Sequence, residues 1–227
     1  MTSGMGFRDR GSRPYRKHNP LPALIVIGVL GFGALCVWGY AILNRSDIND
    51  AIRCSPAAAP PPGAVYTSLD HEALDGTLPI PPDKVAVKVL NAGGTRGQAG
   101  ITTATLKALG FSQTADPQND PAYPESREAT CRGQIRFGEN GTTAARTLSL
   151  LAPCMELVKD NRQDATVDLA IGSSFRDFQP KAEAREILDQ LNEWSRQHQS
   201  GGGEQSTGPT GPSLDQTLLA SSRDVSC

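Results

Sequence analysis

Residues 87–100, VKVLNAGGTRGQAG, form the stretch whose residue types could bind a phosphate. An apolar segment runs into a glycine-rich turn, and a helix-forming segment follows it. A dinucleotide loop has the spacing G-x-G-x-x-G and an acidic residue about 20 positions later at a strand end. Here the first two glycines are adjacent, and Asp116 and Asp120 lie in a polar, proline-containing stretch. The Gly-Lys-Ser/Thr triplet of a P-loop is also missing from the sequence.

These departures favour a tight turn between a strand and a helix over a nucleotide site. Glycine supplies positive φ angles and allows close approach of two backbones. We therefore predict that the segment turns the chain, and we take its residues as a candidate binding surface: Asn91, Gly93, Gly94 and Gly97.

Other catalytic patterns are weak. The histidines are His18, His71 and His198, and no spacing argument places one of them beside a nucleophile. The motifs G-x-S-x-G, H-E-x-x-H and C-x-x-C do not occur, which removes the usual hydrolase, zinc and thiol-redox signatures. Glu139 and Asp168 are the acids close to predicted strand ends. We predict no catalytic residues, no metal and no cofactor, and keep as the alternative an enzyme with an unrecognised carboxylate site.

The elements that position these residues begin at Val85. The segment 85–90 alternates apolar and polar residues, which is typical of a half-buried strand. Helices are predicted over 97–109 and 142–152, and strands over 132–138, 155–160 and 166–172. The stretch 112–130 is predicted to be a long loop with at most one weak strand. This order, β-α-(β)-β-α-β-β, indicates an α+β fold with helices packed on a small sheet.

The segment 21–43 contains 23 residues and no charge. A helix of this length is long enough to cross the hydrocarbon core of a bilayer, about 30 Å thick. Five basic residues and one acid precede this helix. An excess of basic residues keeps the end of a membrane helix that carries them in the cytoplasm. We predict a basic cytoplasmic head over 1–20, a single-pass membrane helix and an extracytoplasmic body. The formal charge of −2 gives no reason to expect a nucleic-acid partner.

Three further segments flank the predicted domain at 84–178. Residues 44–83 are rich in proline, which favours a semi-rigid stalk, and His71 within it is expected to be solvated. Residues 179–198 are predicted to form one more helix, with Ala184, Ile187, Leu188, Leu191 and Trp194 at helical spacing. Residues 199–227 are expected to be a disordered tail.

Two cysteines lie inside the predicted domain, Cys131 and Cys154. A strand followed by a helix brings the chain back to the end where the strand began. That geometry predicts a disulfide between them in a compartment that permits oxidation. Cys54 and Cys227 could pair with each other or with another molecule, and Cys36 is expected to stay a lone thiol in the membrane.

Three motifs in order carry a resemblance to a known family. VAVKVLNAGGTRGQAG, then IRFGENGTTAARTLSLLA, then VDLAIGSSF resembles the LytR C-terminal domain family over residues 84–175. The positions that match its pattern include Asn91, Gly93 and Gly97 in the first turn, and Phe137, Gly138 and Gly172 at strand ends. The loop 112–130 is longer and more proline-rich than the family's second strand.

This resemblance implies an extracytoplasmic, non-enzymatic domain of actinobacterial envelopes. In the family the domain occurs alone on a membrane anchor or behind LytR-CpsA-Psr phosphotransferase domains, which attach glycopolymers to peptidoglycan. The implied function is the maintenance of cell envelope integrity, and the alternative that stays open is a wall-assembly enzyme with an unrecognised carboxylate site. The implied partners are the membrane, a cell-wall polymer or LytR-CpsA-Psr-type envelope proteins.

Overall fold

The computed structural model describes residues 21–44, 46–198 and 212–227. The chain divides into two compact units at Asn44, and each is described by itself. The second unit, from residue 46 to Cys227, is called the body. The predicted basic head at 1–20 lies outside the described residues.

The first unit is the helix α1 (Leu21–Asn44). Residues Leu21–Ile42 are long and apolar enough to cross a membrane, and none of their side chains is buried in the protein. The helix bounds agree with the predicted segment 21–43 to within one residue. Cys36 is a free, exposed thiol on this helix.

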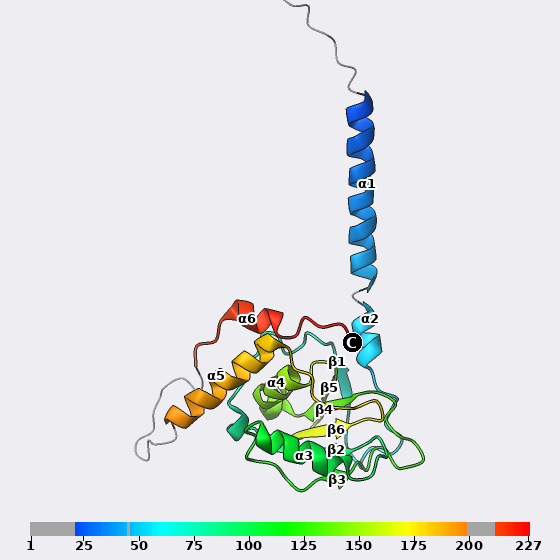
Figure 1. Ribbon diagram of the computed structural model, residues 1–227. Coiled ribbons are helices and arrows are strands. Elements are labelled where there is room, and N and C mark those ends of the chain that lie inside the picture. Colours follow the sequence, from blue (N-terminus) through cyan, green and yellow to red (C-terminus); the bar gives the residue numbers. More distant parts are fainter. Residues whose placement is uncertain (1–20, 45, 199–211) are drawn as a thin grey trace, which may run out of the picture. The chain divides into compact units, whose positions relative to one another are not determined.

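The body is built on one mixed sheet whose strands follow the order β1-β5-β4-β6-β2-β3 (Figure 1). The parallel pairs are β2 with β6, β2 with β3 and β4 with β5, whereas β4 with β6 and β1 with β5 are antiparallel. The strands are β1 (Thr67–Leu69), β2 (Val87–Asn91), β3 (Gln118–Asn119), β4 (Gly133–Phe137), β5 (Glu156–Lys159) and β6 (Val167–Ile171). The α+β prediction is confirmed, and β3 is a two-residue strand inside the predicted loop 112–130.

Helices complete the body in two further layers. The helices α3 (Gln98–Ala108) and α4 (Thr142–Leu151) pack on one face of the sheet, and α5 (Ala182–His198) packs on α4. The remaining helical elements are α2 (Ser46–Ile52), α6 (Gln216–Ser221) and the short 3-10 turns η1 (Pro82–Lys84) and η2 (Glu139–Gly141).

The two faces of the sheet differ in character. The helix-covered face is apolar and forms the main core with α3 and α4; its strand residues are Val87, Val89, Ile135, Phe137, Leu157, Val167, Leu169 and Ile171. The opposite face carries Leu90 and Ala170 beside polar residues such as Gln134 and Arg136. We call these the helix face and the polar face.

The prediction of a solvated stalk over 44–83 is wrong. Cys54 is bonded to Cys131, β1 pairs with β5, and Leu74 is buried in the main core. His71 is 5% exposed, and its Nε2 lies 3.0 Å from the carbonyl oxygen of Pro153. Proline content reports local stiffness, whereas these contacts join residues far apart in the sequence, so the composition could not reveal them.

The predicted bridge between Cys131 and Cys154 is also wrong. Cys54 pairs with Cys131 at a Cα separation of 4.9 Å, and Cys154 pairs with Cys227 at 5.5 Å. The two domain cysteines do precede the parallel strands β4 and β5, as the argument required. However, the flanking segments bring a closer partner to each of them. Cys131 packs with Cys54 in the apolar cluster of the polar face.

The expectation of a disordered tail fails for residues 212–227. Asp215 caps α6 by accepting hydrogen bonds from the backbone of Thr217 and Leu218. Leu214 and Leu219 pack against Leu150 of α4 and the buried stripe of α5. Short helices gain their stability from such packing. The polar stretch before α6 gave no indication in the sequence that the last residues would pack on the body. Residues 199–211 lie outside the described part of the chain.

Candidate functional site

The glycine turn follows β2 and is held by its own side chains. Asn91 donates from Nδ2 to the carbonyl oxygen of Thr95 (2.9 Å) and accepts from the Gly93 amide at 3.3 Å. Gly94 and Gly97 have φ angles of +70° and +81°, which L side chains rarely adopt. At Gly93, a Cβ atom would lie 2.4 Å from the backbone of Gly172. Chain geometry therefore accounts for all three glycines.

A hollow of about 450 Å³ opens beside this turn, at the carboxyl ends of β2 and β3. Its inner polar groups already have partners, because Asp120 binds Arg136 and the Tyr123 hydroxyl donates to the carbonyl oxygen of Ser55 (2.6 Å). Arg96 and Glu128 line the same hollow and are exposed. Of the predicted surface, Asn91 and Gly94 line this hollow, whereas Gly93 and Gly97 lie outside its lining. The role of these four residues in binding stays a prediction.

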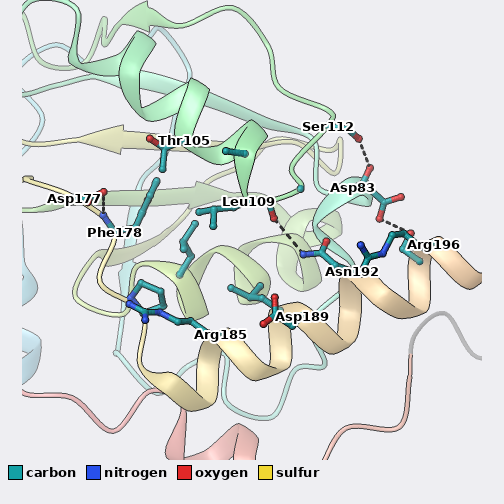
Figure 2. A pocket seen from close by; sticks show the side chains of 16 residues that line it. Asp83, Thr105, Leu109, Ser112, Asp177, Phe178, Arg185, Asp189, Asn192 and Arg196 are labelled. Carbon is teal, nitrogen blue, oxygen red and sulfur yellow. Dashed lines mark hydrogen bonds between the residues drawn. The ribbon is translucent and has the colours of Figure 1, made fainter.

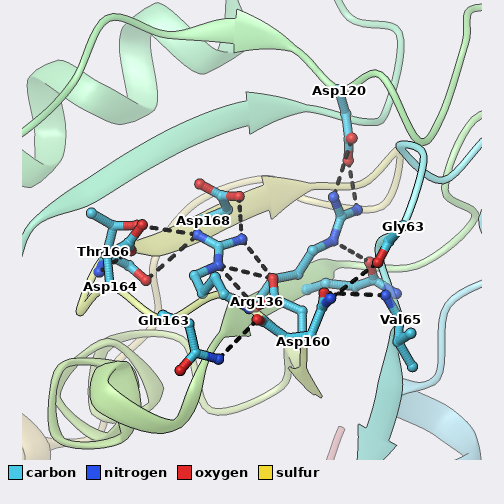
Figure 3. Close-up of polar contacts among 12 residues, drawn as sticks. Gly63, Val65, Asp120, Arg136, Asp160, Gln163, Asp164, Thr166 and Asp168 are labelled. Carbon is cyan, nitrogen blue, oxygen red and sulfur yellow. Dashed lines mark hydrogen bonds and ion pairs between the residues drawn. The ribbon is translucent and has the colours of Figure 1, made fainter.

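Arg136 organises the buried polar groups of the polar face. Figure 3 shows its guanidinium bonded twice to Asp120, at 3.1 and 2.6 Å, and both side chains are almost completely buried. Burial alone would lower the pKa of Arg136, but the hydrogen bond and the charge of Asp120 raise it above its usual value. The ring of Tyr66 lies 5.1 Å from the guanidinium carbon. The arginine is therefore a fixed charge, because its donors are used inside the protein.

The same network continues to β5 and β1. Gln134 accepts from Arg136 Nε and donates to Glu156 at 2.7 Å. Glu156 also accepts from the Ser68 hydroxyl (2.6 Å) and from the Cys54 amide (3.1 Å). Buried polar groups satisfied in this way fix the arrangement of the chain. The network ties β1 and the Cys54 segment to the sheet.

Glu139 and Asp168, the carboxylates of the alternative enzyme hypothesis, lie in separate ion pairs. Glu139 bonds to Lys159, and this hydrogen bond, together with the lysine charge, holds the pKa of Glu139 below its usual value. Asp168 accepts a hydrogen bond of 2.6 Å from Arg162, which also binds Asp160. A general acid at neutral pH needs a raised pKa. Glu139 has the opposite shift, so the geometry does not favour this pair as an acid and base.

A larger groove of about 800 Å³ separates the end of α3 from α5 (Figure 2). Leu109 is 38% exposed and lies at this groove. Its carbonyl oxygen accepts from Asn192 of α5 at 3.4 Å. Buried Phe178 and Leu188 line the floor, and polar side chains of α5 line the rim. The sequence predicted both helices, but nothing in it showed that they leave a groove between them.

Sequence reasoning also missed Asp120 and Arg136 as a pair. Asp120 follows β3 in a polar loop, and Arg136 occupies an ordinary alternating position of a strand. An alignment in which the two residues vary together is the signal that would have paired them. A single sequence contains no such signal.

Comparisons with known proteins agree with this architecture. The family model described as LytR cell envelope-related transcriptional attenuator matches residues 84–175. The chain is 38% identical over 179 residues to the cell envelope integrity protein Cei of Mycobacterium tuberculosis, covering 77% of this chain and 81% of that protein. It is also similar to the crystal structure of the soluble domain of a conserved hypothetical secreted protein from Mycobacterium marinum. That similarity has a TM-score of 0.58 at 34% identity, over 71% of this chain and 97% of that one.

Proposed function

Since the chain belongs to the family of the cell envelope integrity protein Cei and carries a LytR-type C-terminal domain, we propose that it is a membrane-anchored module that maintains envelope integrity. The body lies outside the cytoplasm, and the N-terminus lies inside. The module acts by binding envelope proteins or wall polymer and catalyses no reaction. The observation that carries the proposal is the 38% identity to Cei along 81% of that protein's length.

The structure supports a binding role in two ways. The candidate carboxylates Glu139 and Asp168 are each neutralised by a basic partner in the described body. In addition, the buried polar groups of the polar face are engaged with each other, whereas open grooves remain beside the glycine turn and between α3 and α5. Two disulfides also suit a compartment outside the cytoplasm.

Complementation of a deletion strain tests the function. The strain is expected to become sensitive to detergent and lysozyme, and the wild-type chain is expected to restore resistance. A chain carrying both Glu139→Ala and Asp168→Ala should restore it equally well. If this double variant accumulates to normal levels and fails to rescue, the non-enzymatic proposal is wrong and the carboxylate alternative gains support.

Fusions test the orientation. A phosphatase that is active only outside the cytoplasm should work when it is fused after Phe178 and should fail when it is fused after Lys17. The reverse pattern would overturn the proposed topology.

A further inference from the structure

We propose that the groove between α3 and α5 binds an uncharged glycan strand of the envelope. This inference rests on the proposed function and deepens it, because it assigns the binding surface and the chemical class of the polymer. Of the two proposed kinds of ligand, an envelope protein and a wall polymer, the inference assigns the wall polymer to this groove.

The first observation is that α5 differs between its two exposed sides. On the side away from the groove, polar side chains bond to one another: Gln190 to Glu186, and Gln197 to Glu193. Arg185 and Asp189 line the groove, are exposed, and make no side-chain hydrogen bond or ion pair within the described residues. The groove side therefore keeps unused hydrogen-bonding capacity.

The polar groups on the groove side have a regular spacing, although Asn192 also donates to the carbonyl oxygen of Leu109 and Arg196 to Glu193. Arg185, Asp189, Asn192 and Arg196 follow one another at intervals of four, three and four residues, which places them along one side of a helix. A guanidinium, a carboxylate and an amide are planar groups that can bond two neighbouring hydroxyls at once. A row of such groups suits a ligand with many hydroxyls.

The charges of the groove oppose a charged polymer. Three carboxylates line it, those of Asp83, Asp177 and Asp189, together with the guanidinium groups of Arg185 and Arg196. A polyanion would lie against the carboxylates, and a polycation would lie against the guanidinium groups. Charges of both signs in near balance favour a ligand without net charge.

The floor supplies the apolar contacts that sugar rings need. Leu109, Phe178, Pro180 and Leu188 line the groove together with the polar row (Figure 2). A volume of about 800 Å³ lies in the range of ligand-binding clefts, which combine apolar walls with a few placed polar groups. The apolar faces of pyranose rings can pack on such a floor while their hydroxyls reach α5.

The groove also continues along α3, which suits a linear polymer. A second hollow of about 320 Å³ begins at the N-terminal half of α3 and includes Gln98 and Ile101. Thr105, Asp177 and Phe178 line both hollows, so the two are neighbours. Ile101, which belongs to α3, is 71% exposed. A single sugar would fill only part of this path.

The test is binding of the detergent-solubilised full chain to immobilised arabinogalactan and to a β-1,4-linked N-acetylglucosamine hexamer, with heparin as a polyanionic comparison. The wild-type chain is expected to bind at least one uncharged glycan and to bind it better than heparin. Asp189→Ala combined with Asn192→Ala should weaken binding about tenfold, because hydrogen bonds to a charged and a neutral group are lost. Glu186→Ala combined with Gln190→Ala, on the other side of α5, is the matched control and should bind as the wild type does.

Unchanged melting temperatures will show that the variants fold. Binding to neither glycan, preference for heparin, or full binding by the groove variant would each overturn the proposal. Complementation separates this outcome from the proposed function. If the wild type and the groove variant both restore envelope resistance, the groove assignment falls and the function stands. If the groove variant fails while a protein crosslinked to the groove is lost with it, the ligand is a protein and the glycan proposal is wrong.

Discussion

The two faces of the sheet are stabilised by different means. The helix face joins apolar strand residues to α3 and α4, which lie near those strands in the sequence. The polar face depends on contacts over long sequence separations, such as the bond from the Cys54 amide to Glu156, 102 residues away, and the Cys54–Cys131 disulfide, 77 residues apart. The helix face is therefore built mainly from neighbouring elements, with Leu74 added from a flanking segment, whereas the polar face requires the flanking segments for its disulfide and its hydrogen bonds.

The sharpest test of this difference removes the flanking segments. A fragment limited to residues 84–178 would keep most of the helix face but lose Cys54, β1, His71 and Leu74. We expect it to lack a cooperative thermal transition, whereas residues 46–227 should show one by circular dichroism. A fragment that melts within a few degrees of the whole body would show that the flanking segments are dispensable.

Breaking the buried ion pair should have the next largest effect. Asp120→Ala leaves the guanidinium of Arg136 buried without its carboxylate, which should lower the free energy of unfolding by about 3–5 kcal/mol. On the helix face, Leu148→Ala should cost about 2–5 kcal/mol through the cavity it leaves. Exposed Asp116→Ala is the control and should change stability by less than about 0.5 kcal/mol. Urea unfolding measures all three, and a small loss for Asp120→Ala would contradict the assigned role of the pair.

The disulfides allow the same comparison between the two ends of the chain. Replacing Cys54 and Cys131 with serine should lower stability by about 2–5 kcal/mol, and so should replacing Cys154 and Cys227. The two bridges close loops of similar length, with separations of 77 and 73 residues, so the loop-entropy contribution should be nearly equal. A difference in measured stability would then report the folded-state contacts at each bridge. Mass mapping of the non-reduced protein would contradict the assignment if it found a peptide linking Cys131 to Cys154.

The smallest effect expected is a pH dependence from His71. Burial lowers the pKa of His71, and the charge of Arg223 lowers it further. The unfolded chain, with a histidine pKa near 6.5, therefore takes up the proton first as the pH falls. The contribution of this pKa shift to the free energy of unfolding should be fully present above about pH 6.5. It should be lost as the pH falls toward the pKa of His71 in the folded protein. The variant His71→Gln should lose this part of the pH dependence in urea unfolding at pH 7.5 and 5.0, and an unchanged dependence would contradict the argument.

The helix face could be predicted from the sequence because local periodicity encodes it. Ala144, Leu148 and Leu151 recur at helical spacing in the predicted helix 142–152, and all three are buried. The polar face could not, because alternation assigns Gln134 and Arg136 to a solvent-facing side. Gln134 and Arg136 are buried because the loop with Asp120 and the segment with Cys54 cover them. The alternation of residues along a strand carries no information about such distant segments. The same limit applies to the groove between α3 and α5, where each helix was predicted but their spacing was not.

The glycine turn gives an intermediate case. Its position after a strand and before a helix followed from the sequence, and Gly94 and Gly97 adopt the positive φ angles that glycine allows. The reason for Gly93 lies in the approach of Gly172, 79 positions away in the numbering and on a different strand end. Only the fold reveals that contact.

The pairing of the cysteines has a consequence for how the protein is made. Cys54 bonds to the next cysteine along the chain, Cys131, and Cys154 bonds to the next one after that, Cys227. In the proposed orientation, the residues after α1 leave the translocation channel in chain order. Each newly exported pair of thiols is then already the native pair, and oxidation during export produces the correct bridges without a later exchange of partners. The first bridge can close on the polar face before the segment that carries the second has crossed the membrane.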